Sequence, residues 1–166
     1  MSDLPADIPN FDSAKFRQVL GHFPTGVTVV TAIDDGTPVG MAIGSFASLS
    51  LEPAQVLFCP AKTSSSWPKI RSAGRFCANI LADDQEDVSR VFASKATDKF
   101  AEIGWRRSGN GSPIIEGVLA FIDCEITDVH DGGDHEIVVG TVQDLDVKHE
   151  GSPLVFFRGG YGRVAL

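Results

Sequence analysis

Strand-forming residues dominate the carboxyl-terminal part of the chain. Apolar and β-branched runs occupy residues 114–115, 120–129, 136–147, 154–157 and 161–164, and turn residues separate them. Runs of this kind, bounded by Gly, Pro, Asn and Asp, are typical of short antiparallel strands. Only two or three stretches elsewhere have helical periodicity. The sequence therefore predicts a mainly β protein, an antiparallel barrel with two or three peripheral helices.

The amino-terminal half supplies the remaining elements. Strands are expected over residues 27–33, 39–46, 56–59 and 76–81, with a hairpin turn at residues 34–36. One helix is expected to be capped by Asp12 or Ser13 and to place Phe16, Val19, Leu20 and Phe23 on one face. A second, capped by Ser65 or Ser66, runs to Arg71, and a third covers residues 85–93. Residues 94–112 are predicted to be a loop.

Length and charge bound the kind of protein. The 166 residues are expected to form one domain over residues 12–166, preceded by a flexible lead-in over residues 1–11. A net charge of -8 and the absence of a Lys/Arg run argue against nucleic-acid binding, and they require local donors for any anionic ligand. Three widely spaced cysteines and four histidines show no metal-ligand spacing. Without an apolar span or a signal sequence, no membrane association is expected and a cytoplasmic location is predicted.

The stretch from Gly40 to Pro53 is the first candidate binding segment. It passes from an apolar run into small residues and hydroxyls, which pack poorly inside a buried strand. Small residues suit a backbone that approaches a flat, polar ligand closely. Its three serines can act together only if the segment bends into a loop, because side chains alternate on a strand. The alternative is an ordinary polar loop at the end of the barrel. The candidate contacts are Met41, Ala42, Ser45, Phe46, Ser48, Leu49 and Ser50.

A second hydroxyl cluster precedes the middle helix. Hydroxyls and backbone N–H groups at a helix start, with one lysine beside them, form a phosphate seat. The same residues could equally be a helix N-cap with more hydroxyls than the cap requires. Trp67 could stack on a cofactor, although a core position is the commoner role for such a residue. The candidate contacts are Lys62, Ser64, Ser65, Ser66 and Trp67.

His135 is the candidate catalytic residue. It follows Gly133 and Asp134 at a loop-to-strand junction, where glycine allows a sharp turn that aims the histidine. An imidazole at that place could hydrogen-bond a nicotinamide or donate a proton near a flavin. Alternatively, Asp134 and His135 only close a turn. No serine-nucleophile, Rossmann or P-loop motif is present.

Several segments in order resemble the short-chain flavin reductases, the small reductase components of two-component flavin-dependent monooxygenases. The resemblance rests on residues 16–31, on Gly44 to Pro53, on residues 76–81, on the Gly133-Asp134-His135 triplet, and on residues 153–156 with Gly160-Tyr161. These segments span nearly the whole chain. The resemblance implies an FMN-binding split β-barrel of Greek-key type.

The resemblance also implies site residues. Flavin would lie against Ser45 to Ser50, its phosphate would reach the Lys62–Trp67 segment, and Asn79, Ile80 and Leu81 would lie beside it. His135 would be on the nicotinamide side, with Gly133 and Asp134 shaping its loop and Tyr161 bordering the pocket. Many relatives carry Asn where Gly44 stands, so a side-chain amide is missing here while backbone contacts remain.

The predicted function follows from the residues and the resemblance together. The chain is expected to be a homodimeric NAD(P)H:flavin oxidoreductase that reduces FMN or FAD and supplies reduced flavin to a partner monooxygenase. The hydride donor is NADH or NADPH, and no metal is expected. The alternatives are a non-catalytic flavin-binding module, acting as a sensor or carrier, and an enzyme resembling pyridoxamine-phosphate oxidase, for which no basic substrate site is apparent.

Overall fold

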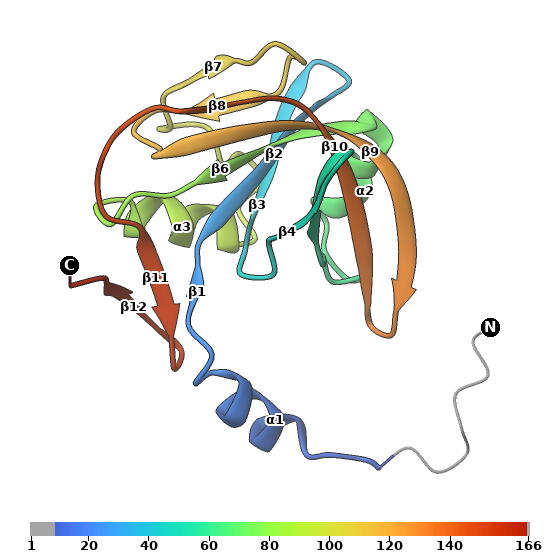
Figure 1. Cartoon of the computed structure of the whole chain (residues 1–166), viewed down its shortest axis with the longest axis vertical. Coiled ribbons are helices and arrows are strands. Elements are labelled where there is room, and N and C mark those ends of the chain that lie inside the picture. The colour runs from blue at the N-terminus through green and yellow to red at the C-terminus, as the bar shows by residue number, and fades with distance from the viewer. Residues whose placement is uncertain (1–8, 166) are drawn as a thin grey trace.

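The computed structural model describes residues 9–165, which are mainly β with three α-helices (Figure 1). Residues 1–8, most of the predicted flexible lead-in, lie outside the described part. The helices are α1 (Ser13–Leu20), α2 (Trp67–Ala73) and α3 (Glu86–Ala93). The strands are β1 (Thr25–Gly26), β2 (Thr28–Asp34), β3 (Thr37–Ile43), β4 (Ala47–Leu51), β5 (Ala54–Phe58), β6 (Arg75–Ile80), β7 (Trp105–Arg107), β8 (Pro113–Ile115), β9 (Ala120–Gly132), β10 (His135–Val147), β11 (Leu154–Phe157) and β12 (Gly160–Arg163). No helix in the described part is long and apolar enough to cross a membrane.

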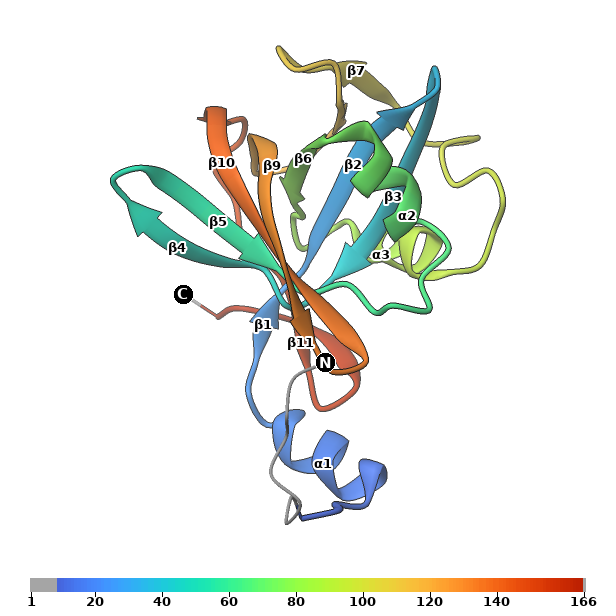
Figure 2. The ribbon, with the colours of Figure 1, turned by 90° about the vertical axis from the view of Figure 1, so that its right-hand side faces the viewer.

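A seven-stranded antiparallel sheet forms the body of the molecule. Its strand order is β3-β2-β6-β9-β10-β5-β4, so β3 and β4 are its edges and do not pair with each other. The sheet curls strongly, and Figure 2 shows the β4–β5 hairpin diverging from β2 and β3. The barrel is thus open on one side, which confirms the predicted antiparallel split barrel with peripheral helices. A second sheet, β1-β11-β12, and the β7–β8 pair complete the β structure.

Two apolar clusters make up the core. One is built around Leu81, Phe92 and Leu154, and the other around Phe58 and Phe76. Helices α2 and α3 each contribute buried residues to one of these clusters. The long hairpin β9–β10 crosses the second cluster so closely that a Cβ at Gly140 would lie 2.6 Å from Cζ of Phe76. Glycine at position 140 therefore lets the ring of Phe76 pack under β10.

Several element boundaries differ from the sequence prediction. The strand expected over residues 39–46 ends at Ile43, and a separate strand, β4, begins at Ala47. Strands β1 and β7 were not predicted, because each has only two or three residues. Strand β1 also depends on a distant partner, β11, whereas β7 pairs with the nearby β8. The predicted link from His130 to His135 is largely strand, since β9 extends to Gly132 and β10 begins at His135.

Helix α1 has the predicted apolar face, but this face is exposed. Asp12 caps it as expected, its Oδ1 accepting from the backbone N–H of Ala14 at 3.0 Å, but the helix ends at Leu20. None of its residues is buried, and it projects away from the sheets (Figures 1 and 2). Phe16 is 58% exposed and Phe23 is 73% exposed. The apolar spacing is present, but among residues 9–165 no element covers this face.

The side chain of Asn79 joins three strands inside the core. It is fully buried, and its Nδ2 donates to the carbonyl of Val29 on β2 at 3.1 Å. Its Oδ1 accepts from the backbone N–H of Ile115 on β8 at 2.9 Å. Strands β2 and β6 already share a ladder, whereas β8 pairs only with β7. The buried amide of Asn79 therefore connects β8 to the main sheet.

We expect Asn79→Ala to lower the free energy of unfolding by about 2–3 kcal/mol, because the N–H of Ile115 and the carbonyl of Val29 would lose a buried partner. Chemical denaturation monitored by tryptophan fluorescence measures the change. Asn10→Ala, which removes an exposed amide, is the matched control and should stay within about 0.5 kcal/mol of the wild type. Equal stability of the two variants would contradict this role for Asn79.

Candidate functional site

The chain between β3 and β5 bends at residues 44–46 and then returns as β4. Ser45 fixes the bend, because its Oγ accepts from the N–H of Cys59 at 2.9 Å and donates to the carbonyl of the same residue at 3.3 Å. Ser48 and Ser50 follow on β4, where the pairing with β5 is irregular between them. The stretch is thus a bend followed by a bulged edge strand, not the single loop that was predicted.

The β9–β10 turn lies beside the chain that follows β5. The N–H of Lys62 donates to the carbonyl of Asp134 at 2.9 Å, and the N–H of Glu136 donates to the carbonyl of Pro60 at 3.0 Å. An isolated bridge also pairs Ala61 with His135. Because Cys59 holds Ser45, the predicted flavin segment and the predicted catalytic turn are joined through residues 59–62.

His135 stands at the end of a tight turn. Gly133 has a φ of 78°, a conformation that a side chain disfavours, so the turn needs glycine there. Nδ1 of His135 lies 2.7 Å from Oδ1 of Asp134. That hydrogen bond and the adjacent imidazole lower the pKa of the Asp134 carboxyl. When Nδ1 carries its proton toward Asp134, Nε2 is the nitrogen left for a ligand.

Lys62 is engaged by an acid of the same hairpin. Its Nζ forms an ion pair with Asp131 on β9. The hydrogen bond from Lys62 lowers the pKa of the Asp131 carboxyl. Both side chains are exposed, so this pair is worth little in stability. The pair directs Lys62 toward β9 in this structure, and its predicted contact with a phosphate stays a prediction.

Ser64 and Ser66, which precede α2, make different hydrogen bonds. The Oγ of Ser64 accepts from the N–H of Trp67 at 3.2 Å and lies 3.9 Å from Sδ of Met41. Ser66 is the N-cap residue, yet its side chain makes no capping bond. Its Oγ accepts from Nζ of Lys99 at 3.4 Å. Ser64 therefore does the capping that was predicted for Ser65 or Ser66.

Trp67 does not stack on a surface ligand. Its side chain is 2% exposed and packs edge-on against Phe58, with ring centroids 5.8 Å apart. The indole Nε1 donates to Oε1 of Glu136 at 3.2 Å, and Arg71 bonds the other carboxylate oxygen of Glu136 at 3.1 Å. The ring belongs to the core, which is the commoner of the two roles that the sequence left open. Through its Nε1, Trp67 holds Glu136, the residue that follows His135.

Two further predicted contacts also belong to the core. Asn79 and Leu81 are both fully buried, and the amide of Asn79 is occupied by β2 and β8. Both side chains thus lie in the core, and the placement of residues 79–81 beside the cofactor stays a prediction. Ile80 between them is half-buried, and its carbonyl accepts from the N–H of Leu119 at 2.9 Å.

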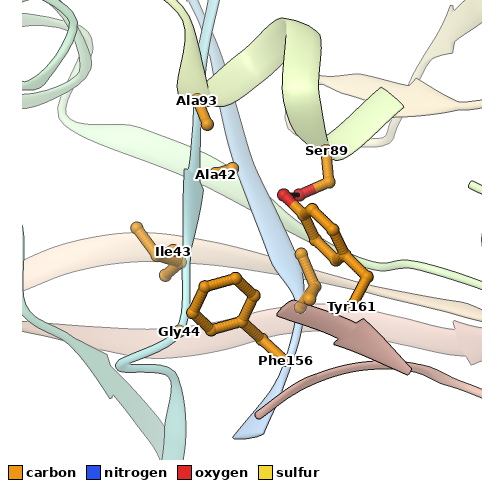
Figure 3. A pocket seen from close by; sticks show the side chains of 8 residues that line it. Ala42, Ile43, Gly44, Ser89, Ala93, Phe156 and Tyr161 are labelled. Atoms are coloured by element: carbon orange, nitrogen blue, oxygen red, sulfur yellow. Dashed lines mark hydrogen bonds between the residues drawn. The ribbon is translucent and has the colours of Figure 1, made fainter. Parts of the chain in front are cut away.

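Tyr161 lines an apolar cavity of about 160 Å³ beside the bend (Figure 3). Its hydroxyl lies 2.8 Å from Oγ of Ser89 on α3, and the Arg90 guanidinium lies 5.0 Å from the ring centroid. Four separate elements supply the remaining lining: Val27, Ala42, Ile43, Gly44, Ala93 and Phe156. Sequence reasoning found Ala42 and Tyr161 but missed the others, since no local motif marks them.

A lysine pocket was also missed. It has a volume of about 210 Å³ and lies between β3, the start of α2 and the loop after α3. Three lysines and two serines supply its polar lining: Lys69, Lys95, Lys99, Ser65 and Ser66. Burial lowers the pKa of the Lys99 ammonium. The lysines lie far apart in the sequence, so only the hydroxyls gave a signal.

The open barrel, the Ser45 bend and the His135 turn together define the class of protein. Residues 20–165 match the family of flavin reductase like domains, and the chain belongs to that family. Its resemblance to flavin reductases, noted from the sequence, is thereby confirmed.

Two curated relatives are similar over nearly their whole length. A flavin reductase of Pseudomonas putida is 56% identical over 168 residues, which cover 99% of each chain. The reductase subunit HsaB of a flavin-dependent monooxygenase from Mycobacterium tuberculosis is 56% identical over 154 residues, covering 90% of this chain and 81% of HsaB.

Two solved structures share the fold. Nitrilotriacetate monooxygenase component B from Mycobacterium thermoresistibile superposes with a TM-score of 0.90 at 53% identity, covering 93% of this chain and 87% of the other. The NADH:FAD oxidoreductase SgcE6 of Streptomyces globisporus C-1027, solved with NAD and FAD fragments, superposes with a TM-score of 0.88 at 35% identity, covering 93% of each chain.

Proposed function

We propose that this flavin reductase oxidises NADH or NADPH to reduce FMN or FAD, and that it supplies the reduced flavin to a partner flavin-dependent monooxygenase. The observation that carries the proposal is the connection of the Ser45 bend to the His135 turn through residues 59–62. A site for hydride transfer must hold two flat rings against each other, and this connection fixes the two segments that would hold them.

The residues present fit a flavin. The bend at Gly44 and Ser45 offers small side chains next to an apolar cavity, and serine hydroxyls lie beyond it at the start of α2. Gly44 suits this place, since a Cβ there would lie 3.1 Å from Oγ1 of Thr25. When bound, the flavin supplies the redox chemistry by accepting a hydride from the dihydronicotinamide.

The chain's own residues provide binding and orientation. Asp134 fixes the ring of His135 through Nδ1, so Nε2 is presented as a hydrogen-bonding group for the nicotinamide. Trp67 and Arg71 together hold Glu136, which keeps the start of β10 in place. The apolar lining around Ala42 and Tyr161 keeps one side of the site dry.

The relatives support the donor and the partner. SgcE6 is named an NADH:FAD oxidoreductase, which favours NADH as the donor here. HsaB is named a reductase subunit of a flavin-dependent monooxygenase, which favours an oxygenase as the acceptor of reduced flavin. The cytoplasmic location predicted from the sequence stays a prediction.

Steady-state oxidation of NADH and of NADPH, followed at 340 nm, tests the proposed function. We expect the purified chain to consume dinucleotide only when FMN or FAD is added. Flavin binding without dinucleotide consumption would favour the carrier or sensor alternative. Consumption that does not depend on flavin would contradict the proposal altogether.

His135→Ala is expected to raise the KM for the dinucleotide about tenfold, the equivalent of one hydrogen bond of about 1.4 kcal/mol, and to leave kcat nearly unchanged. His130→Ala is the matched control, because His130 is an exposed histidine on β9 of the same hairpin. If both variants retain the wild-type KM, His135 does not contact the nicotinamide.

We also propose that the chain is a homodimer, as the sequence predicted. The uncovered apolar face of α1 supports this proposal: Phe16, Val19 and Leu20 are 58%, 58% and 49% exposed. A soluble protein rarely leaves so contiguous an apolar stripe in water. A second copy of the chain is always present at the same concentration, so it is the partner that we propose to cover the face of α1.

Val19→Asp is expected to convert the dimer to a monomer, because a carboxylate would have to be desolvated at the apolar face. Light scattering coupled to gel filtration measures the mass. Lys15→Asp places the same carboxylate on an exposed position of α1 and should leave the dimer intact. A monomeric wild type, or dimers in both variants, would exclude α1 from the interface.

A further inference from the structure

A cavity of about 250 Å³ lies beside the turn that joins β7 to β8. The β7–β8 pair is at the end of the molecule opposite α1 (Figures 1 and 2). Among the described residues, none that lines this cavity also lines the apolar cavity at Tyr161 or the lysine pocket. The cavity is therefore separate from the proposed flavin and nicotinamide site.

Two arginines from different strands converge on this turn. Nη1 of Arg75, the first residue of β6, donates to the carbonyl of Asn110 at 3.4 Å. Nη1 of Arg107, the last residue of β7, donates to the carbonyl of Gly111 at 3.3 Å. In the described part of the chain neither guanidinium has a carboxylate oxygen within 4.0 Å, although Glu125 is opposite Arg75 in the β6–β9 register. Both cations therefore have N–H donors left for an anion.

The turn between the two arginines is held by its own hydrogen bonds. Oδ1 of Asn110 accepts from the N–H of Ser112 at 3.0 Å and from Oγ of Ser108 at 3.0 Å. Nδ2 of Asn110 donates to the carbonyl of Phe76 on β6 at 3.1 Å, and Gly111 has a φ of 92°, which favours glycine. The carbonyls that bond the arginines are thus fixed, so the two guanidiniums are positioned before a ligand arrives.

Ser112 supplies a buried hydroxyl without a partner at the wall of the cavity. The residue is 1% exposed and lines the cavity, and its Oγ makes no hydrogen bond with any described residue. Buried hydroxyls nearly always have a partner, so an unpaired one beside a cavity points to a polar ligand. The half-buried side chains of Ile33 and Ala73 give the same cavity an apolar wall.

We propose that this cavity binds a small organic carboxylate. The guanidiniums of Arg75 and Arg107 pair with its oxygens, and the hydroxyl of Ser112 is a third donor. A planar guanidinium matches a carboxylate with two parallel hydrogen bonds. The apolar wall of Ile33 and Ala73 favours an organic acid over inorganic phosphate, which has no apolar surface to bury. Because none of these residues belongs to the proposed redox site, the carboxylate site does not depend on the proposed function.

An NMR titration of the full chain with benzoate tests the site, because the indole N–H signals of the two tryptophans report where the probe binds. Cζ of Arg107 lies 6.0 Å from the ring centroid of Trp105. Trp67, in contrast, is bonded to Glu136 next to the His135 turn. We expect benzoate to shift the Trp105 signal and to leave the Trp67 signal in place. A shift of Trp67 alone would place benzoate near the His135 turn and overturn the site.

Two comparison ligands separate the charge of benzoate from its ring. Benzyl alcohol has the ring without the carboxylate, and inorganic phosphate has negative charge without the ring. Each should bind at least about tenfold more weakly than benzoate. Phosphate that binds as tightly as benzoate would overturn the preference for an organic acid. Benzyl alcohol that binds as tightly would show that the arginines do not hold the ligand, and would overturn the proposal.

Arg75→Gln and Arg107→Gln should each raise the Kd for benzoate about tenfold or more, the equivalent of losing one charge-assisted hydrogen bond. Arg106→Gln is the matched control, because Arg106 is the exposed neighbour of Arg107 on β7 and does not line the cavity. Its Kd should stay within about twofold of the wild type, since water and salt screen a charge outside the cavity. Equal weakening by Arg106→Gln would make net charge responsible and overturn the site.

Ser112→Ala tests the buried hydroxyl. We expect it to raise the Kd for benzoate about threefold, because one neutral hydrogen bond is lost. The midpoint of thermal unfolding without ligand should not fall, since the hydroxyl has no partner among the described residues. A lower midpoint with an unchanged Kd would make the hydroxyl part of the fold and overturn its place in the site.

Discussion

The structure depends on hydrogen bonds that join the Ser45 bend, residues 59–62 and the His135 turn. The hydroxyl of Ser45 bonds both the N–H and the carbonyl of Cys59. The carbonyl of Pro60 accepts from the N–H of Glu136, and the N–H of Lys62 donates to the carbonyl of Asp134. None of these contacts belongs to a regular ladder, yet together they close the region where β3, β5 and β10 come near each other. Groups paired in this way cannot drift independently, so the site is as rigid as the sheet from which it extends.

Electrostatics divide the site into two ends of different character. Around the His135 turn, acids and bases are already paired, as in Lys62–Asp131 and Asp134–His135. At the start of α2 the lysines face only neutral acceptors or solvent. The pocket at the start of α2 thus gathers three lysines in a chain of net charge -8. Local charge, and not the overall sign, decides where an anionic group can be held.

The sequence predicted well what depends on local pattern. Alternating apolar residues and turn signals located β2, β6, β9, β10, β11 and β12 and the three helices, and the Gly133-Asp134-His135 triplet marked a sharp turn that the structure contains. What failed depends on tertiary partners. Trp67 and Asn79 look like ligand contacts in sequence, but both satisfy their polar groups inside the core. Strand β1 and the lysine pocket exist only because segments distant in the sequence meet.

The bond between the Trp67 indole and Glu136 couples the interior to the surface turn. The ring is wedged against Phe58, whose own neighbour is Phe76 beneath Gly140. Any repacking of these aromatic rings must therefore shift the residue next to His135. Substitutions among these core residues would therefore change the position of the His135 imidazole slightly. The packing of the core thus helps to orient this exposed histidine.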